Sequence, residues 1–162
     1  MNVLEAHPGW VSSQLAEYLQ ANKAPFMARW VERVRRDSGV PSDLLTRTEL
    51  IDHVPVIFDA IIRALMEHRR GSTMEQVQEI AARHTIIRWV QDYDLRAVLK
   101  ELSLLRTEFI CHLRAFEEEQ PLASHDQHLI ASTTIHRILD GIMMDAVDTF
   151  LTLRTRATAD EA

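Results

Sequence analysis

The sequence lacks the features that mark several large classes of protein. It has one cysteine, Cys111, so no disulfide can form within the chain, and this usage fits a reducing compartment. Basic residues are outnumbered 18 to 24, the formal net charge is −6, and no basic block stands out, so nucleic acid is not an expected partner. No apolar run approaches the roughly 20 residues of a membrane-spanning helix, and the N-terminus does not resemble a signal peptide. These absences predict a soluble, cytoplasmic protein.

Motifs of catalysis and cofactor binding are also missing. The chain contains no G-x-S-x-G, no glycine-rich phosphate loop and no H-E-x-x-H. Cys111 lies among apolar residues and is expected to be a small buried hydrophobic side chain rather than a reactive thiol. His125 and His128 have a spacing that could bind a metal, but no further ligand set completes it, so a solvated helix start is expected. The sequence therefore predicts a non-enzymatic protein without cofactor or metal.

The sequence does contain enough apolar residues for a core and a clear helical periodicity. Apolar residues make up 46% of the chain, and its four glycines and five prolines lie mostly at boundaries between periodic segments. Pro55 interrupts one of these segments and predicts a kink or a break. No segment alternates like a strand. The prediction is an all-α, single-domain bundle of six to seven helices over residues 1–154, with a polar tail over 155–162; the helices are expected at about 11–22, 25–36, 46–66, 72–92, 95–118 and 125–153.

The most informative stretch is the turn between the helices expected over 72–92 and 95–118. Tyr93 and Asp94 form the turn, and Asp94 comes directly before an apolar-periodic run, which is typical of an N-cap residue. Two helices joined by so short a turn lie antiparallel. Residues at similar distances from the turn are therefore expected to face one another.

Charged residues on both sides of this turn are candidates for ion pairs. Arg88 and Glu101 lie at nearly equal distances from the turn, and we expect them to pair. Arg106 is expected to pair with Glu101 or Glu108. Such pairs either fix the register of a structural hairpin or belong to a two-state element through which a signal passes, and the sequence leaves both interpretations open.

A histidine on the same hairpin allows two interpretations. His84 shares a helix face with apolar residues, so its ring is expected at the edge of the core. A buried histidine is most often paired with a carboxylate on a neighbouring helix, here Glu108 or Glu101. The alternative is a haem-binding sensor in which His84 is the axial ligand.

The last expected helix has a broader apolar surface than a helix with one buried side needs. Ile135, Leu139, Ile142 and Ala146 form one stripe, and a second stripe adjoins it. We define these four residues as the α-helical seam of the C-terminal helix. The seam is predicted to form a homodimer interface that passes a signal onward, while a buried position inside the monomer is the alternative.

Several of these residues carry a resemblance to a known family. The pattern His84, Arg88, Tyr93-Asp94, then Glu101-Leu102-Ser103-Leu104-Leu105-Arg106, resembles the N-terminal domain of RsbRD-type stressosome co-antagonists, which also heads many bacterial sensor histidine kinases. The stretch from Thr46 to Pro55 is similar to the family's entry into a proline-bearing helix. A glycine common at the family's turn is absent here.

The resemblance implies a function that composition and periodicity do not give. It implies a globin-reminiscent helical architecture and a non-enzymatic bacterial signal-input or protein-interaction domain. Such a domain would regulate an attached or partner signalling protein, for example a histidine kinase or a stress regulator. No kinase phosphoacceptor helix or ATP-binding motif follows Leu153, so we expect either a stand-alone regulator or a piece of a longer protein.

Overall fold

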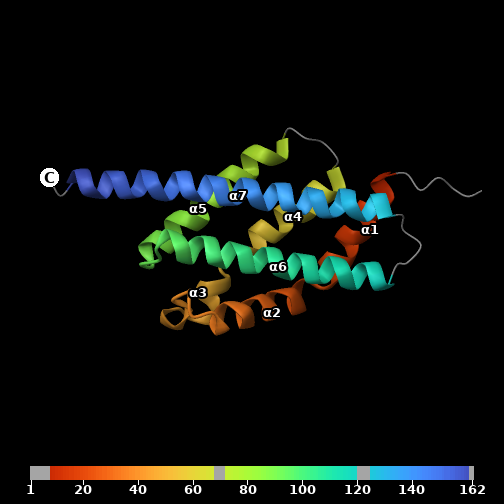
Figure 1. Ribbon diagram of the computed structural model, residues 1–162, viewed down its shortest axis with the longest axis horizontal. Coiled ribbons are helices and arrows are strands. Elements are labelled where there is room, and N and C mark those ends of the chain that lie inside the picture. The colour runs from red at the N-terminus through yellow and green to blue at the C-terminus, as the bar shows by residue number, and fades with distance from the viewer. Residues whose placement is uncertain (1–7, 68–71, 120–124, 161–162) are drawn as a thin grey trace, which may run out of the picture.

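The predicted all-α class is confirmed. The computed structural model describes residues 8–67, 72–119 and 125–160, and in these ranges every regular element is a helix. The elements are α1 (Pro8–Ala21), α2 (Lys23–Arg36), the short 3₁₀ helix η1 (Ser42–Leu44), α3 (Arg47–Ile51), α4 (Val54–Glu67), α5 (Ser72–Val90), α6 (Leu95–Glu119) and α7 (His125–Asp160). Figure 1 shows α7 running along most of the molecule, with α6 beside it.

Local sequence signals account for several helix ends. Thr46 and Glu49 form a reciprocal capping box: Glu49 N–H donates to Thr46 Oγ1 at 3.2 Å, and Thr46 N–H donates to Glu49 Oε2 at 2.7 Å. The predicted N-cap of α6 is also present, because Ala97 N–H donates to Asp94 Oδ1 at 2.7 Å. The caps satisfy backbone donors that a helix start leaves without partners.

The helix expected over 46–66 is broken rather than kinked. α3 ends at Ile51, Asp52 leaves the helical conformation with φ −4° and ψ −68°, and α4 begins at Val54. Pro55 therefore lies in the first turn of α4, where the missing N–H costs no hydrogen bond. The break places His53 in a turn at the junction of α3 and α4.

One hydrophobic core joins the helices. α7 packs against α5, α6, α1 and α4, while α2 packs on α6 and α4 packs on α1 and α5. Rings from three helices meet at its centre: the Phe26 centroid lies 4.9 Å from Phe58 and 4.6 Å from Phe109. Aromatic contacts of this kind stabilise a core beyond the apolar area they bury.

The seam predicted as a dimer interface lies inside this core. Ile135, Leu139, Ile142 and Ala146 are each 0% exposed within the single chain. The prediction was wrong because α7 is covered by neighbours on more than one side, so a broad apolar surface is used within the monomer. A second copy of the chain cannot reach these side chains while the fold is intact.

The C-terminal helix is also longer than predicted. α7 continues to Asp160, beyond the end expected at Leu153, and the side chains over 154–159 are exposed. Phe150 is the last buried side chain of this helix, so its final turns extend past the core. Among the described residues, no helix combines the length and apolar character needed to cross a membrane.

Candidate functional site

The turn between α5 and α6 has the geometry of a Schellman motif. Tyr93 N–H donates to the Arg88 carbonyl at 3.0 Å, and Asp92 N–H donates to the Trp89 carbonyl at 3.1 Å. Asp92 has a φ of 60°, in the left-handed region that glycine usually occupies at this position. The turn therefore reaches, with an aspartate, a backbone conformation that glycine adopts without strain.

The predicted ion pair between Arg88 and Glu101 is present and fully buried. Arg88 Nε donates to Glu101 Oε2 at 2.8 Å and Arg88 Nη2 donates to Glu101 Oε1 at 2.5 Å, with side chains 0% and 1% exposed. This two-pronged geometry is the strongest form of an arginine–carboxylate contact. Burial raises the pKa of Glu101, and the Arg88 guanidinium opposes that shift.

Arg88 also binds a third helix that the sequence did not connect to it. Its Nη2 donates to the Leu50 carbonyl at 2.8 Å and its Nη1 to the Glu49 carbonyl at 3.3 Å, both at the end of α3. Nη1 donates a further hydrogen bond to Gln91 Oε1 at 2.7 Å. All five guanidinium N–H groups thus have acceptors, and one side chain ties together α3, α5 and α6.

The sequence analysis expected His84 to pair with a carboxylate. In the structure it contacts another histidine instead. Its Nδ1 faces Nε2 of His53 at the α3–α4 junction, and the two ring centroids lie 4.2 Å apart. Both rings are buried, and among the described residues His53 Nδ1 and His84 Nε2 have no hydrogen-bond partner. Burial lowers the pKa of His53 to about 3 and lowers the pKa of His84 well below its usual value.

The sequence analysis missed His53 as a site residue. It lies 31 residues before His84, and no periodic pattern links a turn residue to a distant helix. The only available signal was its position beside Pro55, at a helix break. We call His53, His84, Arg88 and Glu101, with the carbonyls of Glu49 and Leu50, the junction network.

Arg106 lies outside this network and forms a different ion pair from the one predicted. Its Nη2 bonds Oδ1 of Asp140 on α7 and lies 3.2 Å from the Met143 sulfur. Neighbours on a helix face are three or four residues apart, so Arg106 does not share a face with Glu101 or Glu108. The pair joins α6 to α7 near the surface.

Glu108 is buried and belongs to a second cluster, between α2 and α6, whose arginines are partly exposed. Arg29 Nε lies 3.1 Å from Glu108 Oε1, and Arg33 Nε donates to Glu108 Oε2 at 2.7 Å. Arg33 also donates to the Cys111 sulfur at 3.5 Å, and the thiol is exposed, so the expectation of a buried cysteine was wrong. This cluster ties α2 to α6.

One hollow on the surface of the described residues reaches the junction network. A groove of about 500 Å³ lies between α4 and α5, and His53 is part of its wall. The groove does not touch His84, whose Nδ1 faces His53 and whose Nε2 is buried without a hydrogen-bond partner among the described residues. No group of three or more metal-binding side chains is found within the described ranges.

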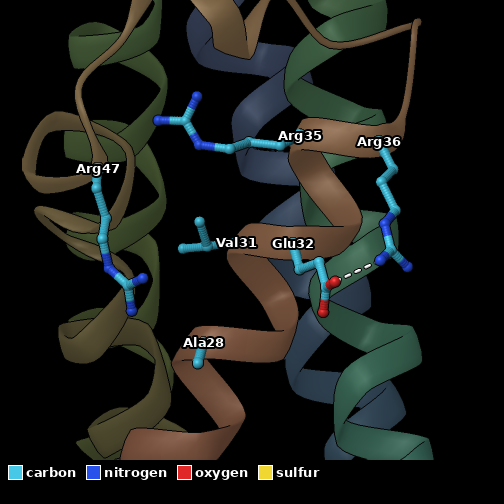
Figure 2. A pocket seen from close by; sticks show the side chains of 6 residues that line it. All are labelled: Ala28, Val31, Glu32, Arg35, Arg36 and Arg47. Atoms are coloured by element: carbon cyan, nitrogen blue, oxygen red, sulfur yellow. Dashed lines mark hydrogen bonds and ion pairs between the residues drawn. The ribbon is translucent and has the colours of Figure 1, made fainter.

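A second hollow, of about 480 Å³, lies between α2 and α3 and is shown in Figure 2. Arg35 and Arg47 come from the two helices that flank it, while Arg36 is paired with Glu32 on the side of α2 away from Arg47 in this view. Arg35 donates to the Leu45 carbonyl at 3.0 Å, so it holds the loop before α3. Of the residues lining this hollow only Val31 is buried, and that residue is apolar.

The architecture is that of a single all-helical domain in its described residues, with one continuous core and a buried polar network at a helix junction. The family model described as the RsbT co-antagonist protein rsbRD N-terminal domain matches residues 25–162. Because the match covers most of the chain, the chain belongs to this family, one of signalling domains of the stressosome co-antagonist type. Neither a curated protein nor a solved structure matches the chain.

Proposed function

We propose that this chain is a non-enzymatic signal-input domain that regulates an attached or partner signalling protein, such as a histidine kinase or a stress regulator. The family membership supports the signalling role. The observation that carries the proposal is the position of Arg88, which binds α3, α5 and α6 at once through buried hydrogen bonds. A change at the α3–α4 junction is therefore transmitted to the hairpin rather than absorbed at the surface.

The route from the hairpin to the rest of the molecule runs through α7. Trp89, next to Arg88 on α5, packs edge-on against Phe150 of α7, with ring centroids 4.8 Å apart. Phe150 lies where α7 leaves the core. We propose that a change in the junction network alters the C-terminal part of α7, which then acts as the output element.

Hydrogen exchange tests this coupling. In Glu101→Gln the network loses a charge but keeps its shape, and we expect faster amide exchange both at the α3–α4 junction and in α7 around Phe150. The matched control is Asp140→Asn, which removes the surface ion pair between α6 and α7 and should leave the junction unchanged. If amide exchange became faster at the junction but stayed unchanged in α7, the proposed route would be contradicted.

A homodimer stays part of the proposal, on a different surface from the buried seam. Val90 at the end of α5 is 75% exposed, and Met144 and Leu151 on α7 are 63% and 48% exposed. Met144 and Leu151 are two helical turns apart and share a face. We propose that a second copy of the chain covers the α7 face that carries Met144 and Leu151. Light scattering should show a dimer for the wild type and a monomer for Leu151→Glu, and a monomeric wild type would contradict the proposal.

A further inference from the structure

The groove between α4 and α5 has a buried polar group in its wall. His53 is 5% exposed, and its Nδ1 has no hydrogen-bond partner among the described residues. Its other nitrogen, Nε2, faces His84. Buried polar groups in folded proteins nearly always have a partner, so the unpaired nitrogen of a residue that lines the groove is a candidate contact for a bound molecule.

The chemistry of the two rings defines which kind of ligand atom should contact this nitrogen. A neutral imidazole carries one N–H. When His84 Nδ1–H donates to His53 Nε2, the hydrogen of His53 resides on Nδ1 and lacks an acceptor. In the reverse arrangement the unpaired N–H is on His84, which the groove does not reach. A hydrogen-bond acceptor in the groove therefore satisfies the buried donor only at His53.

Charged side chains of both signs line the same groove. On α5, Glu79 and Arg83 are one helical turn apart, and neither forms an ion pair within the described part of the chain. The side chains of Asp52 and Arg63 also lack such partners among those residues. The groove thus offers two cations and two carboxylates to a ligand, with no net charge.

Apolar groups complete the surface. Val56 on α4 is 47% exposed, and Ile80 on α5 is partly buried, so both present hydrocarbon to the groove. A volume of about 500 Å³ is in the range of small-molecule sites. An occupant with a short apolar frame would bury both side chains while its polar ends reach the charged residues.

We propose that this groove binds a small zwitterion, with its carboxylate at His53 and Arg83 and its ammonium group at Glu79. Bound carboxylate would fix the His53 tautomer and so the contact of His53 with His84. The consequence for signalling rests on the proposed function, but binding itself does not. The ligand class is that of aliphatic amino acids, in which both charges lie on a short apolar frame.

Three related compounds separate the contributions of the two charges. Valine carries both charged groups, isovalerate lacks the ammonium group and isobutylamine lacks the carboxylate. Titration of ¹⁵N-labelled protein, followed at the imidazole nitrogens of His53 and at Arg83 Nε, should give saturable shifts with valine, weaker binding with isovalerate and none with isobutylamine. Absence of saturation with millimolar valine, or equal binding of all three compounds, would overturn the proposal.

Variants on the exposed wall test the assignment without disturbing the core. Arg83→Gln should weaken valine binding about tenfold, as loss of a charge-assisted hydrogen bond does. Glu79→Gln should reduce valine to the affinity of isovalerate. Arg156→Gln, exposed near the end of α7, is the matched control and should bind as the wild type does. Unchanged binding in Arg83→Gln would refute the site, while the exchange experiment on Glu101→Gln still tests the proposed function separately.

Discussion

Removing either partner of the Arg88–Glu101 pair should lower the free energy of unfolding by far more than the intact pair adds to it. Arg88→Met leaves a carboxylate that is 1% exposed without its cation, and it also frees the carbonyl of Leu50. Breaking a buried ion pair on one side costs about 3–5 kcal/mol, because the remaining charge has no solvent. We expect Arg88→Met at the upper end of this range and Glu101→Leu lower, since the latter leaves Arg88 its three other acceptors.

The double variant distinguishes this reasoning from a simple loss of packing. In Arg88→Met/Glu101→Leu no buried charge remains, so the double variant should be more stable than the sum of the single losses predicts, by at least about 2 kcal/mol. Urea unfolding followed by circular dichroism measures all four proteins. The matched control is the exposed pair, in which Arg106→Gln and Asp140→Asn should each cost under about 1 kcal/mol. Additive losses in the buried pair would refute the argument.

Three further predictions concern other parts of the structure. Because the pKa of His53 is lowered to about 3 and that of His84 well below its usual value, the unfolded chain takes up protons that the folded chain does not. Stability should therefore fall as the pH drops below about 6.5, by about 1.4 kcal/mol per pH unit for each histidine. Urea unfolding at about pH 7.5 and 5.5 measures this loss, and a loss under about 1 kcal/mol would contradict the lowered pKa values. Asp92→Gly should raise the melting temperature, with a stabilisation of up to about 1 kcal/mol, since φ is 60° there; a lower melting temperature would count against strain at the turn. Ile142→Glu should yield an unfolded chain by circular dichroism, because the side chain is 0% exposed, and a folded variant would contradict its place in the core, whereas Leu151→Glu should stay folded and lose any dimer.

The local features of the fold could be predicted from the sequence, because their causes lie within a few residues. The capping box at Thr46 and the N-cap at Asp94 depend on contacts three residues apart, and both are present. The Arg88–Glu101 pair followed from symmetry about a short turn. Such arguments need only helix periodicity and chain connectivity.

Contacts between distant segments could not be predicted in the same way. His53 and His84 are 31 residues apart, and only the packing of α4 on α5 brings the rings together. Periodicity likewise places Ile142 in a broad apolar stripe of its helix. The stripe alone does not distinguish the core of a monomer from an interface between two copies. The partner of Arg106 was missed for the same reason, since Asp140 comes from the packing of α7 on α6.

The length of α7 has a mechanical consequence. After Phe150 the helix continues for ten residues to Asp160, a rod of about 15 Å at 1.5 Å per residue. Each residue in a helix turns the chain by about 100°, so the number of residues after Phe150 fixes the orientation of any segment joined to this rod relative to the core. Because a helix is stiff over this length, a small rotation of α7 at Phe150 would turn its far end by the same angle. Inserting one residue after Phe150 should misalign an attached domain, whereas inserting seven should nearly restore its orientation.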